Sequence, residues 1–260
     1  MKIFDAHLRS DTRSDDDLRN LAYFDTERVV TTAHAPRPFE TADDLLEYFE
    51  FLVEDECRRL EHSGLRAGVA LGVLPEARPE RLHPEIWEHL PDLLEHPRVV
   101  AVGEIGAHAD EPAHWELFER QVEMAVEAGL PVVVTPPSRR RINLTYKMMM
   151  RAEEVGLEPK SMMMNYLDGR SVEHVLRDGF VAGLAIVGAG VAPERAARLI
   201  ADAVETVGSA ERIVLSSALR AGSSDVLGIP KTLASLEEDQ GADEALLRAV
   251  ARENALEFYG

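Results

Sequence analysis

The sequence predicts a single (β/α)8 barrel, an α/β fold of eight parallel strands alternating with helices, on three observations. Its 260 residues are a common length for one such barrel, and 45% of them are hydrophobic, enough to fill a core. Short β-rich runs alternate with longer helical patterns from one end of the chain to the other. Several short runs, such as VVAV and VVVT, are continuously apolar, as expected for parallel strands buried on both faces.

The strands are expected where β-branched and other apolar residues run together between turn signals. Eight segments have this pattern: Lys2–His7, Arg28–His34, Arg66–Val73, Val99–Glu104, Pro131–Thr135, Ser161–Tyr166, Val181–Val187 and Arg212–Ser217. Since strands of such a barrel are parallel, their C-terminal ends should converge on one mouth.

The segments between the strands have apolar residues at helical spacing. In Asp43–His62, for example, Leu45, Phe49 and Val53 share one face and acidic residues occupy the other. The other expected helices are Asp15–Ala22, Glu80–Leu94, His114–Ala128, Asn143–Val155, Ser171–Arg177, Pro193–Val207 and Pro230–Glu238. A last helix, Asp243–Phe258, should close the bottom of the barrel or flank it. No linker or low-complexity tract interrupts the pattern, so one domain over residues 1–260 is expected.

A doubly wound open sheet is the alternative fold. It would place a glycine-rich turn after the first strand, and the segment FDAHLRSD contains no glycine. The segment VGAGVAP after the seventh strand is only a weak glycine pattern, which we interpret as a tight turn between strand and helix. The barrel is therefore preferred.

Bulk charge and cysteine content exclude several classes of partner. A formal net charge of −19 disfavours nucleic acid and anionic membranes as partners, because both are polyanions. Only four of the 28 basic residues are lysine. An acid-rich, lysine-poor surface suits a salty cytoplasm, so we hypothesise that the protein is halophilic.

The single cysteine, Cys57, excludes an intramolecular disulfide and a cysteine-cluster metal site. The N-terminal segment lacks a signal-peptide pattern and no run of 18 apolar residues occurs, so a cytoplasmic protein is expected.

Three segments at matching places carry a family resemblance: FDAHLRS at the end of the first strand, VVAVGEIGAH at the fourth, and ENALEFYG at the C-terminus. The helical segment WELFERQVEMAVEAGLPVVV, which leads into the fifth strand, has a pattern of residues that fits the same family. With these motifs the chain resembles the TatD-type metal-dependent hydrolases of the amidohydrolase superfamily, and within them the branch found in Ebo-type gene clusters. The resemblance covers essentially the whole chain and implies a (β/α)8 barrel with two divalent metal ions at its mouth.

The resemblance also implies six positions for metal ligands. In this chain they are, in order, His7, Arg9, Glu104, Thr135, Tyr166 and a residue at or beside Arg220. Only His7 and Glu104 are still metal-ligand residue types. A guanidinium group at a ligand position repels a divalent cation, whereas metal-assisted hydrolysis needs neutral or anionic donors. A dinuclear centre and the standard two-metal mechanism are therefore not expected; the cofactor is either absent or one divalent metal.

Strand alternation adds a geometric expectation for the surviving residues. Alternate residues of a strand share a face, so Asp5, His7 and Arg9 should point one way, and Val102 should point the same way as Glu104. The catalytic candidates are accordingly Glu104 and His7.

A single metal held by His7 and Glu104, with His34 or His108, is the functional interpretation of the histidines near the mouth. The structural alternatives stay open. His7 could bond Glu104 or Asp5 and no metal, His34 could bond a loop carbonyl, and His108 could lie in solvent. Glu104, a carboxylate at the end of an apolar strand, needs either a function or an ion pair with Arg9.

A set of arginines follows the strand ends and should crowd the same mouth: Arg9, Arg139, Arg140, Arg141, Arg170 and Arg220. The planar guanidinium suits phosphate or carboxylate, so an anionic small molecule is the expected partner, and Tyr166 is placed in the same substrate site. The alternative is that these arginines pair with some of the chain's 47 acidic residues.

Two methionine tracts have predicted structural roles, and three functions are compatible with the sequence. The tract Met162–Met164 lies in a strand and should be packing, whereas Met148–Met150 is either packing or the lining of an adaptable apolar pocket. The chain could be a single-metal hydrolase acting on an anionic small molecule, a non-catalytic protein that binds such a molecule, or a scaffold subunit. An oligomer is possible in each case.

Overall fold

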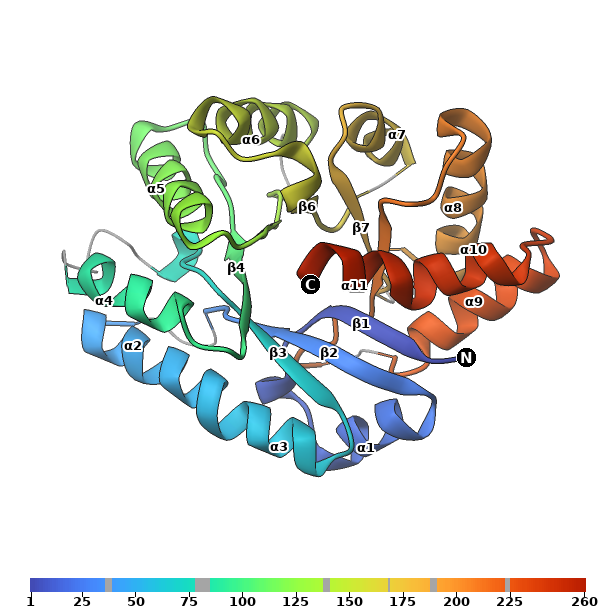
Figure 1. Ribbon diagram of the computed structural model, residues 1–260, viewed down its shortest axis with the longest axis horizontal. Helices are drawn as coiled ribbons and strands as arrows, with labels where there is room; N and C mark the ends of the chain where they lie inside the picture. The colour runs from blue at the N-terminus through green and yellow to red at the C-terminus, as the bar shows by residue number, and fades with distance from the viewer. Residues whose placement is uncertain (36–38, 78–84, 138–140, 168, 188–190, 223–224) are drawn as a thin grey trace.

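The computed structural model describes residues 1–260 except 36–38, 78–84, 138–140, 168, 188–190 and 223–224. Eight parallel strands form one sheet in the order β1 to β8, surrounded by helices (Figure 1). The strands are β1 (Ile3–Leu8), β2 (Thr26–Thr32), β3 (Arg66–Leu71), β4 (Val99–Ile105), β5 (Val132–Val134), β6 (Met162–Met164), β7 (Val181–Ala185) and β8 (Ile213–Ser216). Each lies within one or two residues of the expected segment or inside it, and the predicted (β/α)8 barrel is confirmed.

The barrel closes between β1 and the residues that follow β8. The amide N–H of Ala218 donates to the carbonyl of His7 at 3.0 Å, and the amide N–H of Arg9 donates to the carbonyl of Leu219 at 2.8 Å. Neither edge of the sheet is therefore left as a long unpaired strand at this seam.

The helices follow the predicted alternation with the strands. They are α1 (Asp15–Tyr23), α2 (Ala42–Phe51), α3 (Cys57–His62), α4 (Glu85–Leu94), α5 (Pro112–Ala128), α6 (Arg141–Val155), α7 (Gly169–Arg177), α8 (Pro193–Val207), α9 (Gly228–Glu238), α10 (Glu244–Arg248) and α11 (Asn254–Tyr259). Local sequence fixes several ends. Ser14 caps α1 and Thr41 caps α2, each in a reciprocal capping box, and α5 ends at Gly129 in the left-handed conformation (φ 67°).

Two segments expected to be single helices contain a π-helical turn. In Asp43–His62, α2 continues through the π-turn η2 (Leu52–Glu56) into α3. In Asp243–Phe258, α10 continues through the π-turn η6 (Ala249–Glu253) into α11. Most of the first turn expected for Glu80–Leu94 lies outside the described residues, and α4 begins at Glu85.

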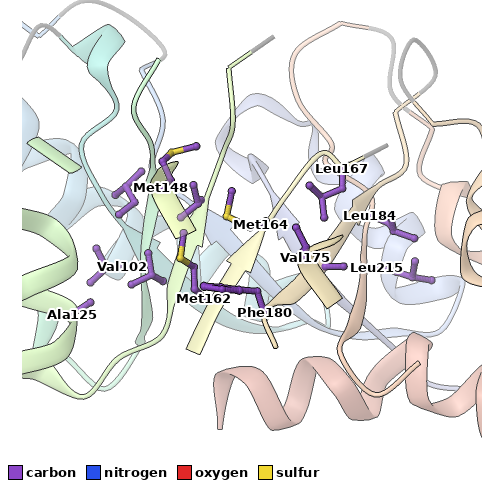
Figure 2. Close-up of a cluster of buried hydrophobic side chains, with 14 of the residues drawn as sticks. Val102, Ala125, Met148, Met162, Met164, Leu167, Val175, Phe180, Leu184 and Leu215 are labelled. Carbon is purple, nitrogen blue, oxygen red and sulfur yellow. The ribbon is translucent and has the colours of Figure 1, made fainter. Parts of the chain in front are cut away.

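The hydrophobic core has two layers. The outer layer lies between the strands and the helices, where Met148 of α6 packs with Val102, Met162 and Met164 (Figure 2). The inner layer fills the barrel and consists of Phe4, Ala6, Val30, Ala70, Ala101, Val133, Met163, Val181, Val214, Ala255, Phe258 and Tyr259. All three methionines of Met162–Met164 are buried, so the prediction that this tract is packing is confirmed.

The C-terminal helix α11 closes the bottom of the barrel, one of the two expected placements. The Tyr259 hydroxyl donates to the carbonyl of Ala6 at 2.7 Å, inside the barrel. The side-chain amide of Asn254 donates to the carbonyls of Ala210 and Ile213, where β8 begins. Since α11 covers the ends where strands begin, the opposite ends form the mouth (Figure 1). Within the described chain, no helix is long and apolar enough to span a membrane.

Candidate functional site

Glu104, near the end of β4, is the centre of the mouth, and its side chain is fully buried. Nε2 of His7, which lies across the barrel on β1, is 2.5 Å from Oε1 of Glu104. The Arg9 guanidinium donates from Nη2 to both carboxylate oxygens, at 3.1 and 3.0 Å, and from Nε to Oε1 at 3.2 Å. His7 and Glu104 therefore meet as predicted, and Arg9 forms the ion pair with Glu104 that is the structural alternative to a functional carboxylate.

Two threonines complete the surroundings of this carboxylate. Thr32 of β2 donates from its hydroxyl to Oε1 of Glu104 at 3.2 Å, and Thr135, just after β5, donates to Oε2 at 2.9 Å. The sequence indicates Thr135 only as a replaced metal ligand and does not single out Thr32. The available signal was a hydroxyl residue at the C-terminal end of a buried strand, which needs a hydrogen-bond partner.

The electrostatics of this cluster favour an ionised carboxylate. Burial alone would raise the pKa of Glu104, but the charges of His7 and Arg9 and their hydrogen bonds outweigh it and hold the pKa well below its usual value. Burial opposes the charge of Arg9 as well, and Glu104 more than compensates, so the pKa of the guanidinium is raised. Glu104 and Arg9 thus form a closed ion pair, with the Arg9 side chain 21% exposed.

Strand alternation describes this region only in part, because the pairing of β1 with β2 and of β4 with β5 is irregular here. Val102 packs in the outer core, whereas Glu104 turns into the barrel, so the expectation that they share a face was wrong. Among the described residues, Asp5 makes no bond to Arg9.

Asp5 instead joins β1 to β8. One of its carboxylate oxygens accepts the amide N–H of Ser217 at 2.9 Å, and the other accepts the Ser217 hydroxyl. Burial raises the pKa of Asp5 to about 6, although the hydrogen bonds from Ser217 lower it in part. This carboxyl group thus connects the first and last strands, and the amide N–H of His7 also donates to it, at 3.4 Å.

Tyr166 lies beside the cluster. Its ring packs edge-on against His7, with 5.6 Å between the ring centroids, and its backbone has a positive φ of 53°. Burial and the charge of Glu104 raise the pKa of the Tyr166 hydroxyl. The phenol is therefore neutral, its oxygen is buried, and Tyr166 is not among the described residues that line the pocket at the mouth.

The two other histidines proposed as metal ligands have different partners. Nε2 of His34 is 3.0 Å from both carboxylate oxygens of Asp11, and the Tyr48 hydroxyl donates to the same carboxylate. Nδ1 of His108 is 2.5 Å from Oε1 of Glu76, an ion pair that contributes to a raised His108 pKa despite partial burial. Each of these histidines thus bonds a carboxylate other than Glu104.

A pocket of about 540 Å³ opens above the cluster. Its lining includes Arg9, Glu104, Arg220, Glu76 and His108. Arg220 is exposed. The structure therefore brings two of the six predicted arginines to one pocket.

The remaining arginines of that prediction cannot be placed there. Arg139 and Arg140 lie outside the described residues, and nothing is described of the Arg141 and Arg170 side chains, although Arg141 begins α6 and Arg170 lies in α7.

As arranged, these residues do not fit a divalent metal ion. A metal at Glu104 would need several neutral or anionic donors, and the groups around its carboxylate are one histidine, two hydroxyls and a guanidinium. The guanidinium repels a cation and already occupies lone pairs of both oxygens. In the described part of the chain, no group of three or more histidine, cysteine, aspartate or glutamate residues could hold a metal.

Comparisons with known proteins give the family. Residues 4–201 match the family described as TatD related DNase. An uncharacterized metal-dependent hydrolase from Methanocaldococcus jannaschii is 27% identical over 261 residues, which cover 99% of both chains.

Solved structures agree in fold. The TatD-like protein from Archaeoglobus fulgidus has a TM-score of 0.80 at 22% identity, covering 98% of this chain and 99% of that one. The phosphotriesterase homology protein from Escherichia coli, complexed with phosphate in its active site, has a TM-score of 0.74 at 15% identity, covering 100% and 99%. Together with the family match over most of the sequence, these results show that the chain belongs to the TatD-related DNase family and is a metal-dependent-hydrolase-like (β/α)8 barrel.

Proposed function

We propose that the mouth of this barrel binds a small molecule bearing a phosphate or carboxylate group, in a remodelled site that lacks the two-metal centre. The observation that carries the proposal is the position of Arg9. Its Nε and Nη2 are fixed on Glu104, while the same side chain lines the 540 Å³ pocket together with Arg220. Among the described residues, Nη1 of Arg9 has no hydrogen-bond acceptor, so one edge of the guanidinium is available for a ligand.

Local charge supports an anion despite the net charge of −19. The lining of the pocket combines the guanidinium groups of Arg9 and Arg220 and the imidazole of His108 with the carboxylates of Glu104 and Glu76, so the charge at the pocket differs from the strongly negative charge of the whole chain. The ion pair with Glu104 also holds Arg9 in one orientation, which reduces the entropy lost when an oxyanion binds. The solved Escherichia coli structure with this fold holds phosphate in its active site, which makes phosphate the first ligand to test.

Calorimetric titration with inorganic phosphate and with small phosphorylated and carboxylated metabolites tests the proposal, on protein treated with a chelator. A charge-assisted hydrogen bond contributes about 1.5–3 kcal/mol, so Arg220→Ala should weaken binding roughly 10- to 150-fold. The matched control is Arg19→Ala, which removes an exposed arginine paired with Asp16 on α1. If the wild type and Arg220→Ala bind all these anions equally weakly, the proposal is wrong.

A single-metal hydrolase is the second candidate, favoured by the family and by the retained contact of His7 with Glu104. In that case Glu104 and His7 would hold the metal and be the catalytic pair, and Arg9 would have to leave the carboxylate. Elemental analysis of protein purified without chelators separates the two candidates. About one equivalent of tightly bound metal per chain would favour the hydrolase, and a metal-free protein that binds phosphate would favour the anion site.

A further inference from the structure

The pocket at the mouth also has apolar residues in its lining. Leu74, Ala35, Pro136 and Pro137 line it together with the charged residues, and its volume of about 540 Å³ is typical of a small-molecule site. Leu74 lies between β3 and the short turn η3 (Pro75–Ala77) and is only 6% exposed. It belongs to none of the hydrophobic clusters that form the core of the described chain. Leu74 is therefore a buried apolar side chain that lines the pocket and is not part of the core.

Two prolines limit what this lining can offer to a polar ligand. Pro136 and Pro137 follow Thr135 just after β5, and both are buried. Proline has no amide N–H, so neither residue can donate a backbone hydrogen bond to a ligand. Their rings are apolar, and the fixed φ of proline makes this part of the backbone stiff. This part of the lining therefore favours apolar contact.

The polar side chains of the lining are largely bonded to one another. Both oxygens of Glu104 already accept hydrogen bonds. Nδ1 of His108 is 2.5 Å from Oε1 of Glu76, and Nε2 of His108 is 3.3 Å from the carbonyl oxygen of Thr135. Since a carboxylate and a carbonyl only accept, both ring nitrogens of His108 are donors and are engaged. Glu76 could still accept a ligand hydroxyl, but its side chain is 55% exposed, so such a bond only replaces one with water.

We propose that this pocket prefers an oxyanion with an apolar body, such as an aliphatic or aromatic monophosphate, to a polyhydroxylated anion such as a sugar phosphate. The inference rests on the proposed function, in which Arg9 and Arg220 hold the oxyanion. An apolar body gains free energy when it leaves water for Leu74 and the two prolines. Ring hydroxyls lose hydrogen bonds with water that the described lining does not replace, and this loss lowers affinity.

Calorimetric titration of the full-length wild type with matched pairs of ligands tests the inference. Cyclohexyl phosphate is paired with an inositol monophosphate, and cyclohexanecarboxylate is paired with quinate. Within each pair the ring and the anionic group are the same, and only the ring hydroxyls differ. In a pair that binds, the cyclohexyl compound should bind about tenfold or more tightly than its hydroxylated counterpart, and cyclohexyl phosphate should bind more tightly than inorganic phosphate.

The possible failures are distinguishable. If the protein binds inorganic phosphate, and the hydroxylated member of each pair binds as tightly as the cyclohexyl member, the inference is wrong and the proposed function stands. If inorganic phosphate and all members of both pairs fail to bind, the proposed function is wrong, and the inference is wrong with it.

Leu74→Asn tests where the apolar body lies. It should weaken binding of the cyclohexyl compounds about tenfold and leave the affinity for inorganic phosphate within about twofold. Leu157→Asn is the matched control, because Leu157 is also 6% exposed and is not among the described residues that line the pocket. A folded Leu74→Asn protein that binds the cyclohexyl compounds as the wild type does would contradict the inference. Circular dichroism establishes folding, and Leu74→Ala replaces the asparagine variant if that variant does not fold.

Discussion

Replacing Arg9 by alanine would show how much of the stability of the mouth comes from its ion pair with Glu104. Arg9 supplies three hydrogen bonds of 3.0 to 3.2 Å to a fully buried carboxylate. Without them Glu104 keeps His7 and two threonine hydroxyls but stays enclosed. Removing one partner of a buried ion pair costs about 3–5 kcal/mol. Because the Arg9 side chain is 21% exposed, we expect the lower end, about 3 kcal/mol, which lowers Tm by roughly 6–12 °C in a chain of this size.

The loss of stability should depend on pH in a defined direction. In the wild type the pKa of Glu104 is lowered, so its ionised form stabilises the folded state above the ordinary carboxyl pKa, and this contribution disappears as pH falls through the lower folded value. In Arg9→Ala the positive charge of Arg9 no longer lowers the pKa of Glu104, so burial should raise this pKa above its value in the wild type. The difference between the two proteins should therefore be largest at pH 7 and shrink on acidification.

Urea denaturation followed by far-ultraviolet circular dichroism at neutral and at mildly acidic pH measures this difference. Glu104→Gln added to Arg9→Ala should recover stability, because the uncharged amide is less costly to enclose. Arg19→Ala, which breaks the exposed pair with Asp16, should change the free energy of unfolding by less than about 0.5 kcal/mol. A stability of Arg9→Ala equal to that of the wild type, or a deficit independent of pH, would refute the reasoning.

Three further changes have defined outcomes. Since the pKa of Asp5 is raised from 3.8 to about 6, the folded protein holds this proton more tightly, and the stability that Asp5 contributes should fall by about 2 kcal/mol between pH 4 and 6. Asp5→Asn, which can still bond Ser217, should reduce this dependence of the free energy of unfolding on pH, as measured by denaturation curves. An unchanged dependence on pH would contradict the assignment to Asp5. Tyr259→Phe removes the hydrogen bond to the Ala6 carbonyl and should cost about 1–3 kcal/mol by the same measurement. Burial raises the pKa of Cys57 to about 12, so the folded chain should react with a thiol reagent only on unfolding, and rapid reaction of the native protein would contradict its placement.

The architecture was predictable because the core patterns are local. Continuous apolar runs such as VVAV identified strands buried on both faces, and helical spacing identified the segments between them. The ends were less exact. β2 stops at Thr32, two residues before His34, because a strand ends where pairing ends and not where apolar residues end. The π-turns inside two helices left no recognisable sign in their apolar spacing.

The site could be predicted only in part. His7 and Glu104 were expected to meet, and they do, because the ends of parallel strands converge. Whether Arg9 turns to Glu104 or to a ligand depends on groups 95 residues away across the barrel, which no local pattern records. The partners of His34 and His108 are Asp11 and Glu76, carboxylates in short turns that have no periodicity to guide an assignment.

The seam between β1 and β8 also sets an order for biosynthesis. The bond of Asp5 with Ser217 joins residues 212 positions apart, and that of Ala6 with Tyr259 joins residues 253 apart. A ribosome adding about 5–20 residues per second needs roughly 10–40 s to make the first of these intervals. During that time β1 has been synthesised but β8, its neighbour on one side, has not. The nascent barrel therefore has an open edge that a chaperone, or another nascent copy, can reach.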